Sequence, residues 1–185
     1  MESNFKWLIS GFLLCGQSLS AADWNTVGAT NSVSFSAIQQ GSPFEGEFAS
    51  FTAQIQFDQA DPASGSIVGV VETGSVRTGD SERDRTLLDR EWFDPNNHPE
   101  SRFESESIEA TDTGFRANGQ LTLKGVTQPV SMDFTFEDTG SGTTAHFSGT
   151  FELERLEFGV GEGFWSDTSW TSNEVTVTVE LDLAQ

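Results

Sequence analysis

Residues able to perform acid–base or nucleophilic chemistry are few in this chain of 185 residues. The chain has two histidines, one cysteine and no tyrosine. His98 precedes a proline in a predicted loop and His146 opens a predicted strand, so we expect both to be structural or exposed rather than general bases. Serine is abundant, but it lacks the sequence context of a nucleophile elbow. The sequence therefore predicts a protein that is not an enzyme, and a hydrolase is the function that these residues support least.

Two polar groups offer limited chemistry. Asp94, Asn96 and His98 are of types that ligate metals, but a loop of this composition is more often a plain turn, so we predict no metal site. Arg83 and Asp84 have two interpretations: they orient a polar headgroup at a lid, or they form an ion pair on a helix surface. We predict no catalytic residue, and we take Arg83 and Asp84 as candidate headgroup residues.

The aromatic residues indicate a different kind of function. Sixteen phenylalanines and five tryptophans give large apolar faces with few polar groups, which suits a long hydrocarbon ligand that accepts no hydrogen bonds. The alternative is that these rings pack a closed core, as aromatic residues usually do. Whether the interior is filled or hollow is therefore the functional question.

The stretch 115–136 sets the geometry that the other elements must fit. Apolar residues occupy alternate positions on both sides of Lys124-Gly125. A period of two is typical of antiparallel strands that have one polar and one apolar face. Gly125 is able to take a positive φ in a turn, and Pro129, which lacks an N–H, is expected at the start of the second strand. The stretch is therefore predicted to be a β-hairpin.

Alternation of the same kind predicts about eight strands along the chain. They cover residues 33–37, 51–57, 67–76, 102–109, 114–123, 130–137, 145–153 and 175–183. A change of spacing between Phe48 and Phe51 predicts a β-bulge. Eight antiparallel strands can close into an up-and-down barrel, which holds one small ligand or a filled core. We favour the barrel, and a β-sandwich is the alternative because one sequence does not give the strand order.

A short amphipathic helix is predicted between Asp80 and Glu91, after the third strand. Ser81 is expected to cap it, and Leu88 and Trp92 are expected to stack on one side with Leu87 beside them. A helix in an otherwise all-β chain usually covers a sheet edge or closes a barrel mouth. The helix is therefore predicted to be a lid.

Residues 1–22 have the features of a secretory signal peptide, with Lys6 before an apolar run and cleavage after Ala22. A transmembrane anchor is the first alternative, but the run of about eight residues is short of the roughly 20 that span a bilayer. A lipoprotein anchor on Cys15 is the second, although Leu14 is larger than the residue usual before such a cysteine. Cleavage leaves residues 23–185 as one domain in the periplasm or outside the cell.

Charge restricts the partners. The chain has 29 acidic and nine basic residues, a formal net charge of −20. This charge argues against binding of nucleic acid and against electrostatic docking on anionic lipid. We expect no nucleic-acid partner and no stable membrane insertion. Transient contact with a membrane or a respiratory protein, and a dimer, are compatible with the sequence.

Several motifs resemble those of the YceI family and occur in the same order. They are Arg83-Asp84, Trp92-Phe93-Asp94 with His98-Pro99, Phe103 with Ser105, the run from Gly119 to Val130, and Arg155-Leu156-Glu157-Phe158-Gly159-Val160. The match covers nearly all of residues 23–185. The resemblance implies a periplasmic or secreted lipocalin-like barrel that binds polyisoprenoids, including the tails of isoprenoid quinones, or amphiphiles of similar shape.

Two positions depart from the pattern of that family. Gln39-Gln40 stands where many members carry a histidine near the end of the first strand, and Glu157 stands where aspartate is commoner. The first departure puts a headgroup contact from that strand in doubt. The second changes only the length of a side chain.

We therefore predict a lipid-binding barrel that carries or stores a long-chain isoprenoid lipid, such as ubiquinone, and needs no cofactor besides this ligand. The predicted cavity-lining residues are Phe35, Phe51, Ile55, Leu88, Trp92, Phe93, Phe103, Phe115, Leu121, Met132, Phe134, Phe147, Phe151, Phe158, Phe164, Trp165 and Val177. A non-catalytic interaction module in the breakdown of extracellular polymers is the alternative. Exposed tryptophans on a flat face would indicate that function, and Trp165 and Trp170 are the candidates.

Overall fold

The computed structural model describes residues 21–139 and 142–185. The predicted signal peptide lies outside the described residues except for Ala21 and Ala22, and Ala22 already pairs with Phe57 in the sheet. The strands are β1 (Ala22–Thr26), β2 (Ser32–Gln39), β3 (Ser42–Phe48), β4 (Phe51–Phe57), β5 (Ser66–Glu72), β6 (Val76–Arg77), β7 (Glu100–Ala110), β8 (Phe115–Leu123), β9 (Val126–Asp138), β10 (Thr144–Glu154) and β11 (Glu174–Ala184). One α-helix, α1 (Ser81–Leu87), lies between β6 and β7.

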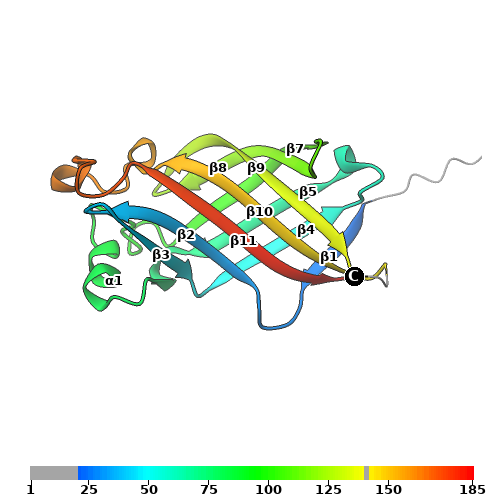
Figure 1. Cartoon of the computed structure of the whole chain (residues 1–185), viewed down its shortest axis with the longest axis horizontal. Coiled ribbons are helices and arrows are strands. Elements are labelled where there is room, and N and C mark those ends of the chain that lie inside the picture. The colour runs from blue at the N-terminus through cyan, green and yellow to red at the C-terminus, as the bar shows by residue number, and fades with distance from the viewer. Residues whose placement is uncertain (1–20, 140–141) are drawn as a thin grey trace, which may run out of the picture.

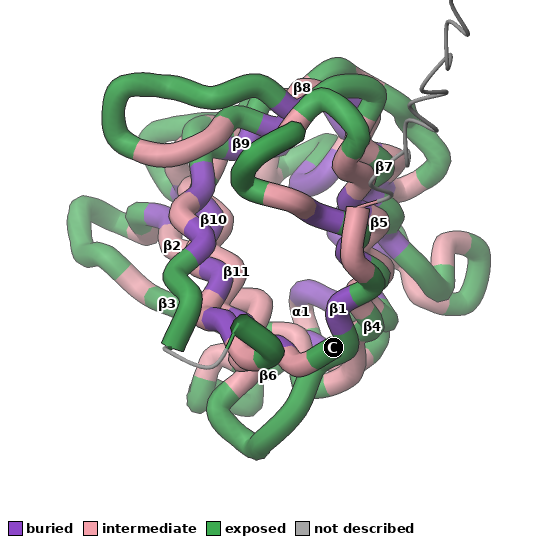
Figure 2. Tube along the Cα trace, turned by 90° about the vertical axis from the view of Figure 1, so that its right-hand side faces the viewer, coloured by how far each residue is buried: buried purple, intermediate pink, exposed green. Residues whose placement is uncertain are grey.

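The sheet closes on itself. Antiparallel pairing runs in the order β1-β4-β5-β7-β8-β9-β10-β11, and β11 pairs back onto β1. Viewed end-on, the strands form a ring (Figure 2). The predicted eight-stranded antiparallel barrel with one short helix is confirmed, and the alternative of a β-sandwich was wrong.

Eleven strands make eight passes of the chain because three passes are interrupted. β2 and β3 extend the hairpin of β1 and β4, and β6 extends β5, each after a shift of register. The break between β3 and β4 falls at Ala49-Ser50, which is where the spacing between Phe48 and Phe51 predicted a bulge. Interruptions of this kind let a long strand bend, so the barrel is tall enough to have two different halves.

The hairpin of β8 and β9 turns through Lys124 and Gly125, with φ of 50° and 77°, as a two-residue turn of this twist requires. The prediction for Pro129 was wrong, because β9 begins at Val126 and Pro129 lies inside it, opposite Gln120. Proline is tolerated there because β9 pairs with β10 only from Asp133 onward, which leaves no ladder on that side of Pro129.

Helix α1 is capped by Asp80 rather than by Ser81. The Asp80 carboxylate accepts hydrogen bonds from the backbone N–H groups of Glu82 and Arg83, and the bond from Arg83 is the first cause that lowers the pKa of Asp80. The helix ends one turn earlier than predicted. As a result Leu87 turns inward at 4% exposure, while Leu88 remains 36% exposed.

The two ends of the barrel differ (Figure 1). At one end, here the lid end, lie α1 and residues 155–173, which follow β10. At the other, here the far end, lie β1, the C-terminal residue and the turns 58–65 and 111–114. No helix among the described residues is long and apolar enough to cross a membrane.

Candidate ligand-binding cavity

A cavity occupies the half of the barrel beside the lid end, here the lid half. Along β4, the inward side chains of Phe51 and Ala53 are only partly buried, whereas those of Ile55 and Phe57 are fully buried. β11 shows the same change, since Val175 to Val179 are partly buried and Leu181 is buried. An inward residue that is still accessible borders an internal space. On these two strands the interior therefore changes from hollow to filled partway along the strand.

The cavity has a volume of about 160 Å³. Only Thr52, Ser101, Arg155 and Thr171 among its lining residues are polar. An apolar cavity of about 150 Å³ in another protein stays dry and binds benzene. The space as it stands therefore accepts a ring or a short length of hydrocarbon, and a long tail would have to displace aromatic side chains or extend out of the mouth.

Small residues create the space. Ala53 and Gly69 lie directly opposite each other on β4 and β5, and Gly69 also faces Phe103 on β7. A Cβ added to Gly69 would meet no atom within 4 Å. By contrast, a Cβ on Gly119 would come within 2.3 Å of the backbone oxygen of Glu104. Gly69 is therefore not required by backbone packing, and its missing side chain leaves part of the cavity open.

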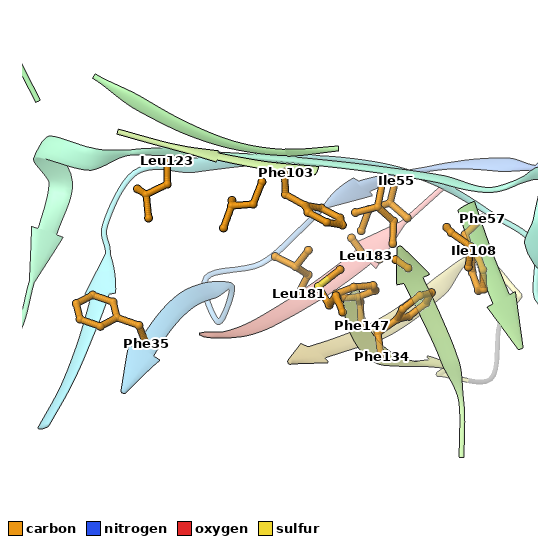
Figure 3. Packing of buried hydrophobic residues seen from close by; sticks show 14 of the residues in the cluster. Phe35, Ile55, Phe57, Phe103, Ile108, Leu123, Phe134, Phe147, Leu181 and Leu183 are labelled. Carbon is orange, nitrogen blue, oxygen red and sulfur yellow. The ribbon is translucent and has the colours of Figure 1, made fainter. Parts of the chain in front are cut away.

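The far half of the interior is filled by rings. Figure 3 shows Phe57, Phe134 and Phe147 gathered together, while Phe35 stands apart. Ring contacts in this half, including Trp24 with Phe136, have centroid distances of 4.8 to 5.4 Å. Ring contacts that involve residues bordering the cavity on its lid side, including Trp92 with Trp165, measure 5.6 to 6.5 Å. The same residue type thus packs closely at one end and loosely at the other.

Most of the residues predicted to line a cavity do border it. They are Phe35, Phe51, Ile55, Trp92, Phe93, Phe103, Leu121, Met132, Phe147, Phe151 and Val177. They come from strands far apart in the sequence and from the segment after α1. The structure brings them together around one space, with Phe147 at the boundary with the filled half.

Six of the predicted lining residues lie elsewhere, and these predictions were wrong: Leu88, Phe115, Phe134, Phe158, Phe164 and Trp165. Phe115 and Phe134 belong to the filled far half, because their positions on β8 and β9 are near that end. Phe158 is buried in the 3-10 helix Arg155–Phe158. Leu88 is exposed because Leu87 takes the inward position. Phe164 is exposed, and Trp165 lies at the mouth.

The sequence interpretation missed several lining residues. These are small or aliphatic residues such as Val33, Ala37, Ala53, Gly69, Val175 and Val179, the rings of Phe44 and Phe48, and Arg155. Alternation along β2 and β11 was a signal for the valines, because they share a face with predicted residues. No local signal marks Gly69, since its effect depends on which residues face it across the sheet.

A second, polar pocket of about 240 Å³ adjoins the cavity at the lid end. The two share the walls Phe44, Leu87, Trp92 and Thr171. Arg83 lines this mouth pocket, with its guanidinium 4.4 Å from the centre of the Phe44 ring and its Nε donating to Gln39 Oε1 at 3.0 Å. Within the described residues no carboxylate forms an ion pair with Arg83. Its terminal N–H groups therefore form no ion pair, although the carboxylates of Asp80 and Glu82 line the same pocket.

Asp84 faces away from Arg83. Its Oδ1 accepts hydrogen bonds of 2.7 Å from the N–H and the hydroxyl of Thr78. The interpretation of Arg83 and Asp84 as an ion pair was therefore wrong. Asp84 fastens the start of α1 to the preceding loop, and only Arg83 lines the mouth pocket.

Arg155 is a buried cation at the edge of the cavity, 2% exposed. Its five N–H groups donate to backbone oxygens of Val160, Gly161, Trp165, Thr171 and Ser172. Burial lowers the pKa of Arg155, but a guanidinium remains charged in proteins. This one side chain therefore fixes the loop 160–172, which forms part of the mouth of the cavity. It also places a positive charge beside the mouth.

The remaining titratable candidates lie away from the cavity. Asp94 Oδ2 accepts a hydrogen bond from Asn97 Nδ2 at 2.8 Å, and the backbone oxygen of Asp94 accepts from the N–H of His98. The described part of the chain contains no group of three His, Cys, Asp or Glu residues able to hold a metal ion. His146 bridges Glu180 and Asp182 on the outer wall. The arrangement provides apolar binding with a polar mouth, and it assembles no acid–base pair in the cavity.

Comparison with known proteins identifies relatives of this chain. A family model described as the YceI-like domain matches residues 24–183. A UPF0312 protein of Ectopseudomonas mendocina is 32% identical over 168 residues, which cover 86% of this chain and 88% of that protein. A UPF0312 protein of Serratia proteamaculans is 30% identical over 141 residues, which cover 74% of this chain and 71% of that protein.

Solved structures share the fold. BcnA of Burkholderia cenocepacia is 32% identical with a TM-score of 0.80, and the match covers 87% of this chain and all (100%) of that chain. A polyisoprenoid binding domain from Saccharophagus degradans, implicated in plant cell wall breakdown, is 12% identical with a TM-score of 0.63. That match covers 87% of this chain and 97% of that chain, and it shows likeness of fold alone.

Proposed function

Because the chain belongs to the YceI-like domain family, we propose that its barrel binds the hydrocarbon tail of a long-chain isoprenoid lipid without catalysing a reaction. The apolar cavity of the lid half is the observation that carries this proposal. Its walls offer a tail almost no hydrogen-bonding groups, as an isoprenoid chain requires. The barrel therefore suits a ligand whose body is hydrocarbon and whose polar end remains at the mouth.

The ligand that we propose is an isoprenoid quinone, such as ubiquinone, carried or stored in the periplasm after removal of residues 1–22. Burying a 40-carbon tail from water would contribute about 30 kcal/mol at about 0.8 kcal/mol per carbon, which exceeds the ceiling for non-covalent binding. The same tail is already dry in a bilayer, so transfer between bilayer and barrel is close to neutral. Near-neutral transfer is what reversible carriage needs.

Arg83 is the group that we propose for contact with the headgroup. Its guanidinium is fixed by Gln39 and by the Phe44 ring, and it lines the polar pocket that opens from the cavity. A guanidinium donates hydrogen bonds to carbonyl or phosphate oxygens. Gln39 accepts the hydrogen bond from Arg83 Nε and so positions this guanidinium. The positive charge of Arg155 beneath the mouth favours the same electron-rich headgroups.

Filling the cavity tests this function. Gly69→Phe places a ring in the open space, and Val68→Phe adds the same ring to the other face of β5 as a matched control. We expect Gly69→Phe to weaken binding of a short-chain quinone by about tenfold or more, because the ring occupies the volume that the tail needs. Val68→Phe is expected to bind as the unmodified protein does.

Quenching of tryptophan fluorescence measures this affinity, and mass spectrometry of solvent extracts identifies any lipid that co-purifies. Equal quinone binding by Gly69→Phe and the unmodified protein would contradict a ligand inside the barrel. Purified protein from a bacterial host that yields no isoprenoid or fatty amphiphile, and that takes up no added quinone, would contradict lipid binding altogether.

A further inference from the structure

Aromatic side chains gather on the surface at the lid end. Phe164 is 66% exposed and Trp170 is 42% exposed, and both belong to the segment after β10. The Phe164 ring lies 5.4 Å from that of Trp165 and 5.9 Å from that of Trp170. Ile38, also exposed, is tied to this segment through hydrogen bonds with Ser172. We call Phe164, Trp165, Trp170 and Ile38 the aromatic rim.

The rim is continuous with the cavity. Trp165 lines the mouth pocket beside Arg83, and its ring lies 5.6 Å from that of Trp92. Trp92 in turn borders the apolar cavity. An apolar path therefore runs from the exposed surface through Trp165 and Trp92 into the barrel. Exposed apolar patches of this kind mark interaction sites.

Both ends of the molecule carry a net negative charge. The turns 27–31, 58–65 and 111–114 contain no lysine or arginine, and they include Asp58, Asp61 and Asp112. The lid end holds most of the basic residues of the domain: Arg77, Arg83, Arg85, Arg90, Lys124 and Arg155. Acidic residues are interspersed there as well. An anionic surface would therefore repel both ends, and docking at the lid end has to depend on apolar contact.

We propose that the aromatic rim docks on the interfacial layer of a lipid bilayer, so that the mouth of the barrel faces the source of its ligand. This rests on the proposed function. A hydrocarbon tail that crossed water between bilayer and barrel would expose its carbons to water, at a free-energy cost of about 0.8 kcal/mol per carbon. Contact through the rim removes that exposed step. Tryptophan rings lie preferentially at the boundary between headgroups and hydrocarbon, and apolar side chains bury shallowly there.

Two features favour a bilayer over other occupants. The rim lies at the mouth rather than on a side wall, and it continues into the cavity. Its contact is also shallow, since four side chains are too few for stable insertion. The rim thus predicts reversible and weak partition into vesicles, with the apolar contribution larger than the electrostatic one.

Vesicle partition tests this inference with the full domain. The double variant Phe164→Ser with Trp170→Ser removes the two exposed rings, and Val27→Ser removes an exposed apolar residue near the far end as a control. We expect the double variant to partition into phosphatidylcholine vesicles about tenfold more weakly than the unmodified protein, and Val27→Ser to partition as the unmodified protein does. Added phosphatidylglycerol is expected to weaken binding of all three, because of the net charge of −20.

The affinity of each variant for a water-soluble, short-chain quinone separates this inference from the proposed function. We expect the double variant to keep that affinity, because its substitutions do not line the cavity. Equal vesicle partition of the double variant and the unmodified protein would overturn docking by the rim even if quinone binding is normal. Loss of a dimer, or of binding to a soluble polysaccharide, in the double variant with vesicle partition unchanged would likewise overturn it.

Discussion

The two halves of the barrel are built from the same eight passes of chain and from the same residue types, yet one is filled and the other is hollow. Phe57 and Phe51 lie on one face of one strand, six residues apart. Phe57 is 2% exposed and contacts three other phenylalanine rings, whereas Phe51 borders the cavity. The comparison teaches that aromatic content does not decide whether a barrel interior is core or binding site. The residues that face each aromatic ring decide it.

The halves also differ in what holds them together. Close ring contacts stabilise the far half. At the lid end, hydrogen bonds from Arg155 to backbone oxygens hold the loop that bears the mouth. This division separates stability from function, since side chains around the mouth can move without breaking the packing of the far half. Three pairs of substitutions, each a variant with its matched control, test the division.

The largest expected effect is that of Phe57→Ala. Replacing a fully buried phenylalanine by alanine costs about 3 to 5 kcal/mol of the free energy of unfolding, because it leaves a cavity among closely packed rings. Phe51→Ala is the matched variant in the lid half. It should cost about 1 to 2 kcal/mol, because one side of that ring already lacks partner atoms. Urea unfolding followed by far-UV circular dichroism measures both.

Ligand binding should respond in the opposite order. Phe51→Ala alters the wall of the cavity and is expected to change quinone affinity, whereas Phe57→Ala should leave that affinity nearly unchanged in the folded protein. Equal stability losses for the two variants would show that the halves are packed alike. The distinction between a filled and a hollow half would then fail.

Arg155→Met is expected to have the next largest effect. It leaves five backbone oxygens without their donor, and buried unsatisfied groups cost about 1 to 3 kcal/mol each, part of which water recovers once the loop opens. We therefore expect a net loss of about 2 to 4 kcal/mol. Amide hydrogen exchange should rise first in residues 160–172, because those oxygens hold that loop.

The control for this variant is Arg116→Met. Arg116 forms an exposed ion pair with Asp133 on the outer wall, and the Asp133 hydrogen bond is the first cause that raises the pKa of Arg116. An exposed pair contributes little to stability, so this variant should unfold at nearly the same urea concentration as the unmodified protein and show no local change in exchange at the lid end. Uniformly faster exchange in Arg155→Met would indicate instead that Arg155 stabilises the whole barrel.

The sequence predicted the strands and turns of the barrel better than it predicted the cavity. Period-two alternation depends on which face of a strand is buried, and the turn at Lys124-Gly125 is a local feature, so the hairpin of β8 and β9 was predictable. The cavity depends on the pairing of Ala53 with Gly69, which is a matter of register between strands. The inward position of Leu87 instead of Leu88 depends on where α1 ends. Neither is encoded by a local pattern.

The smallest expected effect is that of His146→Gln, which tests whether side-chain hydrogen bonds on the outer wall stabilise the far half. A hydrogen bond of 2.9 Å to Asp182 is the first cause that raises the pKa of His146, followed by the bond of 3.0 Å to Glu180. Glu137 faces His146 from β9. The bond from Thr30 and then that from His146 lower the pKa of Asp182.

Since the pKa of His146 is raised in the folded state, its contribution to stability is complete below the unfolded value of about 6.5 and is lost as the pH rises through the folded value. We therefore expect the free energy of unfolding to fall as the pH rises above about 6.5 in the unmodified protein, and to fall less in His146→Gln. The difference should be under about 1 kcal/mol, because the pair is partly exposed and salt screens it. His98→Gln is the matched control, because the described bonds between a histidine and carboxylates all involve His146. The opposite result, a pH dependence that disappears in His98→Gln and persists in His146→Gln, would place the titrating group at the lid end. It would contradict a stabilising role of the His146 hydrogen bonds in the far half.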